Sequence, residues 1–193
     1  MSTGEQLIIG QLAGPYAGVS TGGSPFSGPG GFLYAATNSN LVNLNMGLPS
    51  SGSFTFGFPG AFIGLAVDGA SNTTSRTQFS GTYNAASRSV TFRGMADFTN
   101  IAGFGAASFN FGGSGTIPGS SDSLKNASLG WSCTGAGCQS SAGSGTWDSR
   151  FAHSSTSIPA QVLNGGLVNG TRNGASGNTV IFTGGLKCVS GGC

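Results

Sequence analysis

The sequence predicts an all-β protein, either an antiparallel β-barrel or a β-sandwich of about ten short strands. Apolar and polar residues alternate in one run after another, as they do along half-buried strands. Short segments rich in Gly, Pro, Ser and Asn separate these runs. Helical spacing occurs only in residues 100–107, which are too few and too rich in Gly to predict a helix.

The alternation is clearest between Arg76 and Phe111. Three runs are separated by residues 84–87 and 99–103, which are short enough to be hairpin loops. We therefore expect three antiparallel strands in a meander, with the apolar phase of each strand in one core. The residues of that phase are Phe79, Tyr83, Val90, Phe92, Phe98, Phe109 and Phe111.

Further strands are expected on both sides of this meander. Residues 53–58 and 63–67 read as two strands, with a turn at Pro59-Gly60 between them. Later strands are expected at 124–131, 146–151, 161–163 and 179–183. Three Asn-Gly pairs lie within residues 164–174, too close together to be separate hairpins, so we expect an exposed loop there.

The composition excludes several classes of protein. Only 6% of the residues are charged, whereas about a quarter is typical, and 37 of the 193 residues are Gly. The 14 Phe residues exclude a disordered chain, and the lack of a Gly-X-Y period excludes collagen. Nucleic acid is excluded as a partner because the basic residues form no cluster. They are Arg76, Arg88, Arg93, Lys125, Arg150, Arg172 and Lys187.

The four cysteines form two pairs with the same spacing, Cys133 with Cys138 and Cys188 with Cys193. An even number of cysteines in a Gly/Ser-rich chain favours disulfides and an oxidising compartment. We predict local pairing within each pair, although two other connectivities are possible. A zinc site is disfavoured because its usual Cys spacing is shorter and the chain has one histidine.

The first 31 residues read as a Gly/Pro/Ser-rich arm before a single domain at residues 32–193. No signal peptide is visible, so we expect a removed signal; another export route and reduced intracellular cysteines remain alternatives. No run approaches the ~20 apolar residues of a membrane helix. The arm is either a flexible leader or a segment that docks on another subunit, and we predict the second. Its apolar residues are Leu7, Ile8, Leu12, Tyr16, Val19 and Phe26.

One order of motifs carries a family resemblance. The stretch Leu-Pro-Ser-Ser-Gly at residues 48–52 precedes Phe-Thr-Phe, a long meander, Gly-Ser-Gly-Thr at 113–116, a Cys pair and a Trp/Phe strand. Over residues 32–151 this order resembles the C-terminal β-barrel regions downstream of FecR-type domains. It is also similar to the small barrels of transferrin-binding-protein-B-type surface lipoproteins, although their lipobox cysteine is absent. The resemblance implies a soluble, cell-surface barrel and carries over no functional residue.

No catalytic or cofactor motif emerges, so we predict that the protein is not an enzyme and holds no cofactor. His153 lies near Asp148 and Ser149, but a triad is defined by geometry and not by nearness in sequence. The Gly-x-Ser-x-Gly match at residues 18–22 lies in the arm, without the strand and helix of a nucleophile elbow. No Gly-Lys-Ser/Thr loop and no cluster of carboxylates is present.

Low charge, an apolar arm and the missing catalytic motif favour a structural function. We expect an extracellular or particle-surface subunit that assembles with copies of itself, such as a filament, sheath or capsid component. The alternative is a monomeric surface β-barrel that binds a protein, a sugar or a small hydrophobic ligand. Polymers isolated from the native source would favour the first function, and a monomer the second.

Overall fold

The structure is a computed structural model, and it describes most of the chain after residue 46 together with four strands before it. The described residues are 7–12, 16–19, 25–28, 32–37, 47–66, 74–101, 105–153, 156–168, 171–172, 175–176, 179–191 and 193. Side chains are described at 47–57, 78–101, 105–153, 156–167, 180, 182–191 and 193. All regular elements in these ranges are β-strands, so the predicted all-β class is confirmed.

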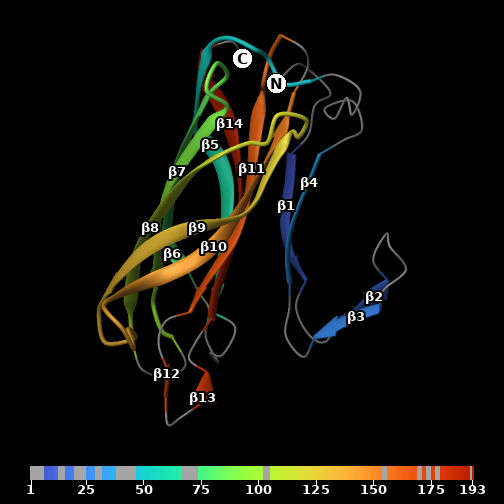
Figure 1. The fold of residues 1–193 in the computed structure, drawn as a ribbon. Helices are drawn as coiled ribbons and strands as arrows, with labels where there is room; N and C mark the ends of the chain where they lie inside the picture. Colours follow the sequence, from blue (N-terminus) through green and yellow to red (C-terminus); the bar gives the residue numbers. More distant parts are fainter. Residues whose placement is uncertain are drawn as a thin grey trace.

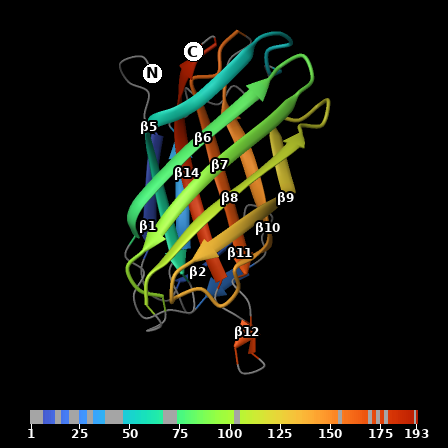
Figure 2. The same cartoon turned by 90° about the vertical axis from the view of Figure 1, so that its left-hand side faces the viewer.

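Eight strands form one closed antiparallel barrel (Figures 1 and 2). Each pairs with the next along the chain, and β14 pairs with β5 to close the ring. Of the two expected architectures, the structure therefore has the barrel, with eight strands in it rather than about ten. The barrel strands are β5 (Ser53–Ala66), β6 (Thr74–Asn84), β7 (Ser89–Phe98), β8 (Ala107–Thr116), β9 (Ser123–Thr134), β10 (Ala142–Ala152), β11 (Ala160–Val168) and β14 (Thr179–Ser190).

The predicted core residues all lie inside this barrel. Each of the seven apolar residues expected between Phe79 and Phe111 is buried, and all belong to one hydrophobic cluster. Residues between them, such as Thr82 and Thr91, point outward and are exposed. The alternation in the sequence therefore identified both the strands and the direction of their side chains.

Aromatic rings fill the barrel to its axis. Strands β8 and β14 lie on opposite sides of the ring, yet the ring centroids of Phe111 and Phe182 are 4.8 Å apart. Strands β6 and β10 also lie opposite, and Tyr83 meets Phe151 at 4.9 Å. An eight-stranded barrel is just wide enough for side chains to fill its interior. A ligand of this part of the chain must therefore bind outside the barrel or at its ends.

Two expectations about strand boundaries are wrong. No turn occurs at Pro59-Gly60; β5 runs through both residues, opposite a register irregularity between Gly185 and Lys187 of β14. Pro is tolerated at such a bulge because the ladder needs no N–H donor there. Residues 164–168 are not loop but the second half of β11, which stays paired with β14 as far as Val168.

Short sheets lie outside the barrel. Strand β1 (Leu7–Leu12) pairs with β4 (Phe32–Thr37), β2 (Tyr16–Val19) with β3 (Pro25–Gly28), and β12 (Thr171–Arg172) with β13 (Ala175–Ser176). The β1–β4 pair crosses the boundary expected at residue 32. It contacts β14 and β5, and Figure 1 shows it beside the barrel, on the side opposite β8.

Burial on the outer face of β14 agrees with the position of the β1–β4 pair beside it. Thr183 and Gly185 belong to the outward phase of β14, between the inward-pointing Phe182 and Leu186, yet both are buried. The side chains of the predicted arm, from Leu7 to Phe26, lie outside the described side chains. The β1–β4 pair therefore covers the side of the barrel formed by β14 and β5, and it does not cover the side formed by β6–β9 (Figure 2).

Candidate functional site: a glycine-floored groove on the outer wall

The open outer wall of the barrel is formed by β6, β7, β8 and β9, which face the viewer in Figure 2. Many outward positions on these strands carry hydroxyl or amide side chains or no side chain at all. Thr82 and Thr91 mark one row across the strands, with their hydroxyl oxygens 2.6 Å apart. Because hydroxyl and amide groups both donate and accept hydrogen bonds, this wall suits a polar partner.

Strand register places two glycines side by side in the middle of this wall. Gly112 of β8 is opposite Gly130 of β9, and Arg93 of β7 is opposite Gly112 on its other side. Ser80 and Ser144 extend the row to β6 and β10. Since neither glycine has a side chain, the row has a trough with Arg93 at one side.

A second row borders the trough and gives it a polar rim. Met95 is opposite both Gln78 and Asn110, and Asn110 is opposite Ser132. Two adjoining hollows of about 440 and 400 Å³ open on this surface and share Arg93 and Asn110. We call the surface around Arg93, Asn110, Gly112, Gly130 and Ser132 the outer groove.

Arg93 differs from the other arginines whose side chains the structure describes. Arg88 donates to the carbonyl oxygens of Ile117 and Pro118, at 3.2 and 2.9 Å, and so holds two turns together. Arg150 lies 3.6 Å from the carboxylate of Asp122. Arg93 is exposed, and within the described residues its guanidinium has no hydrogen-bond or ion-pair partner. It is therefore available to an outside group.

The two floor glycines are glycine for different reasons. A Cβ on Gly112 would lie 2.7 Å from the carbonyl oxygen of Phe92, so packing within the sheet excludes a side chain. A Cβ on Gly130 would meet no atom within 4 Å, and its backbone does not need a positive φ. Glycine inside a strand costs stability and often marks a place where a ligand or another backbone comes close. Packing among the described residues therefore does not require glycine at position 130.

The predicted disulfides both form within their pairs. Cys133–Cys138 closes the β9–β10 turn with a Cα separation of 5.9 Å. This turn packs against the start of β8, where the N–H of Gly137 donates to the carbonyl of Ala106 at 2.9 Å. The bridge therefore holds one end of the barrel.

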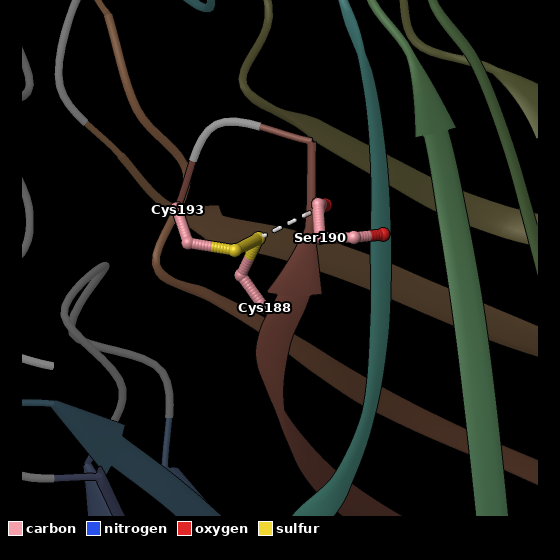
Figure 3. Close-up of a disulfide and its surroundings, with 3 residues drawn as sticks. All are labelled: Cys188, Ser190 and Cys193. Carbon is pink, nitrogen blue, oxygen red and sulfur yellow. Dashed lines mark hydrogen bonds between the residues drawn. A yellow bond between two sulfur atoms is a disulfide. The ribbon is translucent and has the colours of Figure 1, made fainter.

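Cys188–Cys193 lies at the other end of the barrel and follows the closing strand β14, with a Cα separation of 5.4 Å (Figure 3). Figure 3 also marks the 3.4 Å approach of Cys188 Sγ to the carbonyl oxygen of Ser190. A disulfide sulfur carries no hydrogen, so this approach is a sulfur–oxygen contact. Gly191 presses its backbone against Ser53, where a Cβ would collide with the Ser53 carbonyl. The bridge thus clamps the end of β14 against the start of β5.

The residues near His153 do not form a catalytic triad. Ser149 points into the barrel, where its hydroxyl accepts from Gln161 Nε2 at 3.0 Å. Asp148 accepts instead from the backbone N–H of Asn126 at 2.7 Å. His153 Nε2 lies 3.8 Å from a carboxylate oxygen of Asp122. These polar residues hold the strands and the barrel end in place.

Burial also affects the chemistry of Tyr83. Desolvation raises the pKa of its phenol, and the nearby positive charge of Arg88 lowers the same pKa to a lesser extent.

Among the described residues, no group of His, Cys, Asp or Glu side chains could hold a metal ion. The described chain also contains no helix that could cross a membrane.

The outer groove was not found from the sequence. Alternation in the sequence places Arg93 on the polar face of its strand. The available signal was the glycine at two outward positions, Gly112 and Gly130, within otherwise regular alternation. That signal needs the register of β8 against β9, which local patterns do not give.

No protein-family model matches the chain, and no curated protein matches it significantly. The class of protein is thus given by the fold and its outer wall: a filled, eight-stranded antiparallel barrel with two local disulfides.

Proposed function

We propose that the protein is a binding module of an oxidising, extracellular or cell-surface environment, and that it binds another molecule through the outer groove. The carrying observation is the outer groove itself, where Arg93, without a partner among the described residues, lies in the same row as Gly130, a strand glycine that packing does not require. Two disulfides are consistent with the oxidising environment. The resemblance to transferrin-binding-protein-B-type barrels supports the same function and adds no residue to the site.

Three features favour a rigid surface over an internal ligand site. The barrel axis is filled by aromatic rings, so a small hydrophobic ligand has no room among the described residues. At the groove, β7 and β8 are each paired on both sides, so a partner bound there does not add a strand to the barrel. The disulfides hold both ends, so the wall is preorganised and little ordering cost accompanies binding.

The test is selective capture from the native source. The wild-type protein, an Arg93→Gln variant and a Gly130→Val variant are immobilised, and retained molecules are quantified by mass spectrometry. Lys187→Gln is the control, because Lys187 is an exposed cation on β14, away from the groove. A partner held by the wild type and the control but lost by both groove variants supports the proposal. Equal retention by all four proteins contradicts it.

Self-assembly is the second candidate, and the β1–β4 and β2–β3 sheets favour it. Each is two-stranded, so in the described part of the chain their outer edges are unpaired. Unpaired edges are templates for pairing with another copy. In this candidate the two-stranded sheets themselves would pair with their counterparts in a second copy.

The corresponding test removes residues 1–37, which takes away β1 to β4 together. We expect the barrel to fold by circular dichroism, because its ladder begins at Ser53. Light scattering coupled to size-exclusion chromatography then compares the truncated and full chains. Loss of an oligomer on truncation supports assembly through the hairpins, and a monomeric full chain refutes it.

A further inference from the structure

We propose that the outer groove recognises a carboxylate on a protein partner, an Asp or Glu side chain carried by an extended segment that crosses β6–β9. This inference rests on the proposed binding function and specifies the ligand. Arg93 would bind the carboxylate, and Gly130 would let the backbone of the segment come close to the barrel wall.

Charge supports the choice of a carboxylate. Arg93 is the only charged residue in the two rows of the groove, and the others carry hydroxyl, amide or thioether groups or no side chain. A guanidinium binds a carboxylate through two parallel N–H donors, a match of geometry as well as charge. Asn110, which faces the same hollow, supplies an amide that can donate to the same carboxylate.

The dimensions of the groove support an extended segment. The row that contains Arg93, Gly112 and Gly130 crosses the strands and does not follow them. Neighbouring strands lie ~4.8 Å apart, so the path from β6 to β9 is roughly 14 Å, or about four extended residues. Backbone–backbone pairing with the barrel is excluded because β8 and β9 are paired on both sides. Side chains of the groove must therefore carry the recognition.

A protein segment is favoured over an acidic saccharide, which also offers carboxylates. Aromatic side chains give apolar faces on which a sugar ring can pack. Among the described residues, Val189 is the only large hydrophobic side chain that is exposed, and it lies at the end of β14. The groove has hydrogen-bonding groups for a peptide but no exposed aromatic ring for a sugar.

The experiment is a titration of the full-length ¹⁵N-labelled protein, followed by its amide resonances. Three probes are used: the peptide acetyl-Gly-Gly-Asp-Gly-amide, the same peptide with Asn in place of Asp, and glucuronate. The proteins are wild type, Arg93→Gln, Gly130→Val and the control Lys187→Gln. We expect the Asp peptide to shift the amides of Asn110, Gly112, Gly130 and Ser132 in the wild type and in the control.

Affinity should fall at least about tenfold for the Asn peptide, and equally for the Asp peptide on Arg93→Gln. A tenfold loss corresponds to about 1.4 kcal/mol, the lower end for a hydrogen bond to a charged group. Gly130→Val should weaken the Asp peptide, because a branched side chain blocks the floor. Glucuronate should bind more weakly than the Asp peptide.

Three results would overturn the inference. Equal affinity for the Asp and Asn peptides would show that the groove binds a peptide without recognising its carboxylate. If glucuronate binds as tightly as the Asp peptide, and Gly130→Val binds the Asp peptide as tightly as the wild type does, the site is a simple ion pair with Arg93. Absence of shifts at the groove with every probe rejects the ligand class, whereas selective capture by the wild type over Gly130→Val would still support the proposed function.

Discussion

Two glycines on opposite faces of the same wall should respond with opposite signs to the same substitution. Gly94 of β7 lies between Phe79 of β6 and Phe111 of β8, on the inner face. A Cβ there would be 2.5 Å from Phe79 Cζ and 2.7 Å from Phe111 Cε2, whereas carbon atoms in favourable contact are about 3.5–4.0 Å apart. Both rings would have to move by about 1 Å.

The rings have little space in which to move. The centroids of Phe79 and Phe111 are 5.3 Å apart, and both rings pack against Phe182, at 5.9 and 4.8 Å. Overpacking of this kind costs about 1–3 kcal/mol, partly offset by about 0.4–1 kcal/mol because alanine restricts the unfolded chain. We expect Gly94→Ala to lower the free energy of unfolding by about 1–2 kcal/mol. Gly130→Ala meets no atom and should raise it by about 0.4–1 kcal/mol.

Urea unfolding of the oxidised protein, followed by tryptophan fluorescence, measures both variants. For an m-value near 2 kcal/mol/M, the two midpoints should differ by about 1 M. The slopes should stay equal, because neither substitution changes the surface exposed on unfolding. Equal urea midpoints for the two variants would show that the inner and outer faces have been assigned incorrectly.

Three further predictions concern the core, the pH dependence and a disulfide. Phe92→Ala should lower the free energy of unfolding by about 3–5 kcal/mol, whereas Thr91→Ala, at an exposed position, should change it by less than about 1 kcal/mol in the same urea assay. The free energy of unfolding of the wild type should fall above about pH 10, because Tyr83 ionises in the unfolded chain while burial keeps it protonated in the folded protein. The Tyr83→Phe variant should show a smaller fall over the same pH range, and a fall as steep as that of the wild type would contradict the prediction. Replacing Cys188 and Cys193 with Ser should cost about 2 kcal/mol, measured by calorimetry, and no loss would argue against the bridge.

The parts of the fold that depend on neighbouring residues were predictable. Alternation alone located Phe92 inside and Thr91 outside, because successive side chains of a strand point to opposite faces. The identical spacing of the cysteine pairs predicted both local bridges. In contrast, the turn expected at Pro59 is part of a continuous strand, because residues 58–60 of β5 bulge against the single residue between Gly185 and Lys187 of β14, which no local pattern reveals.

The parts that depend on distant pairing were not predictable. Closure joins β14 to β5, which are separated by most of the chain, and residues 164–168 form a strand through pairing with β10 on one side and β14 on the other. The groove has the same origin, since it exists where Gly112 and Gly130 are in register. Arg93 could be recognised as exposed from the sequence, but its place beside a glycine floor could not.

The position of β14 in the chain has a consequence for synthesis. It is the last barrel strand to leave the ribosome, and one side of β5 and one side of β11 stay unpaired until it does. Until then the other seven strands form at best an open sheet whose two edges can pair with other chains. Contacts of such long range also slow folding. A nascent chain halted before Thr179 should therefore need protection from aggregation, whereas in the finished chain β14 pairs with both β5 and β11.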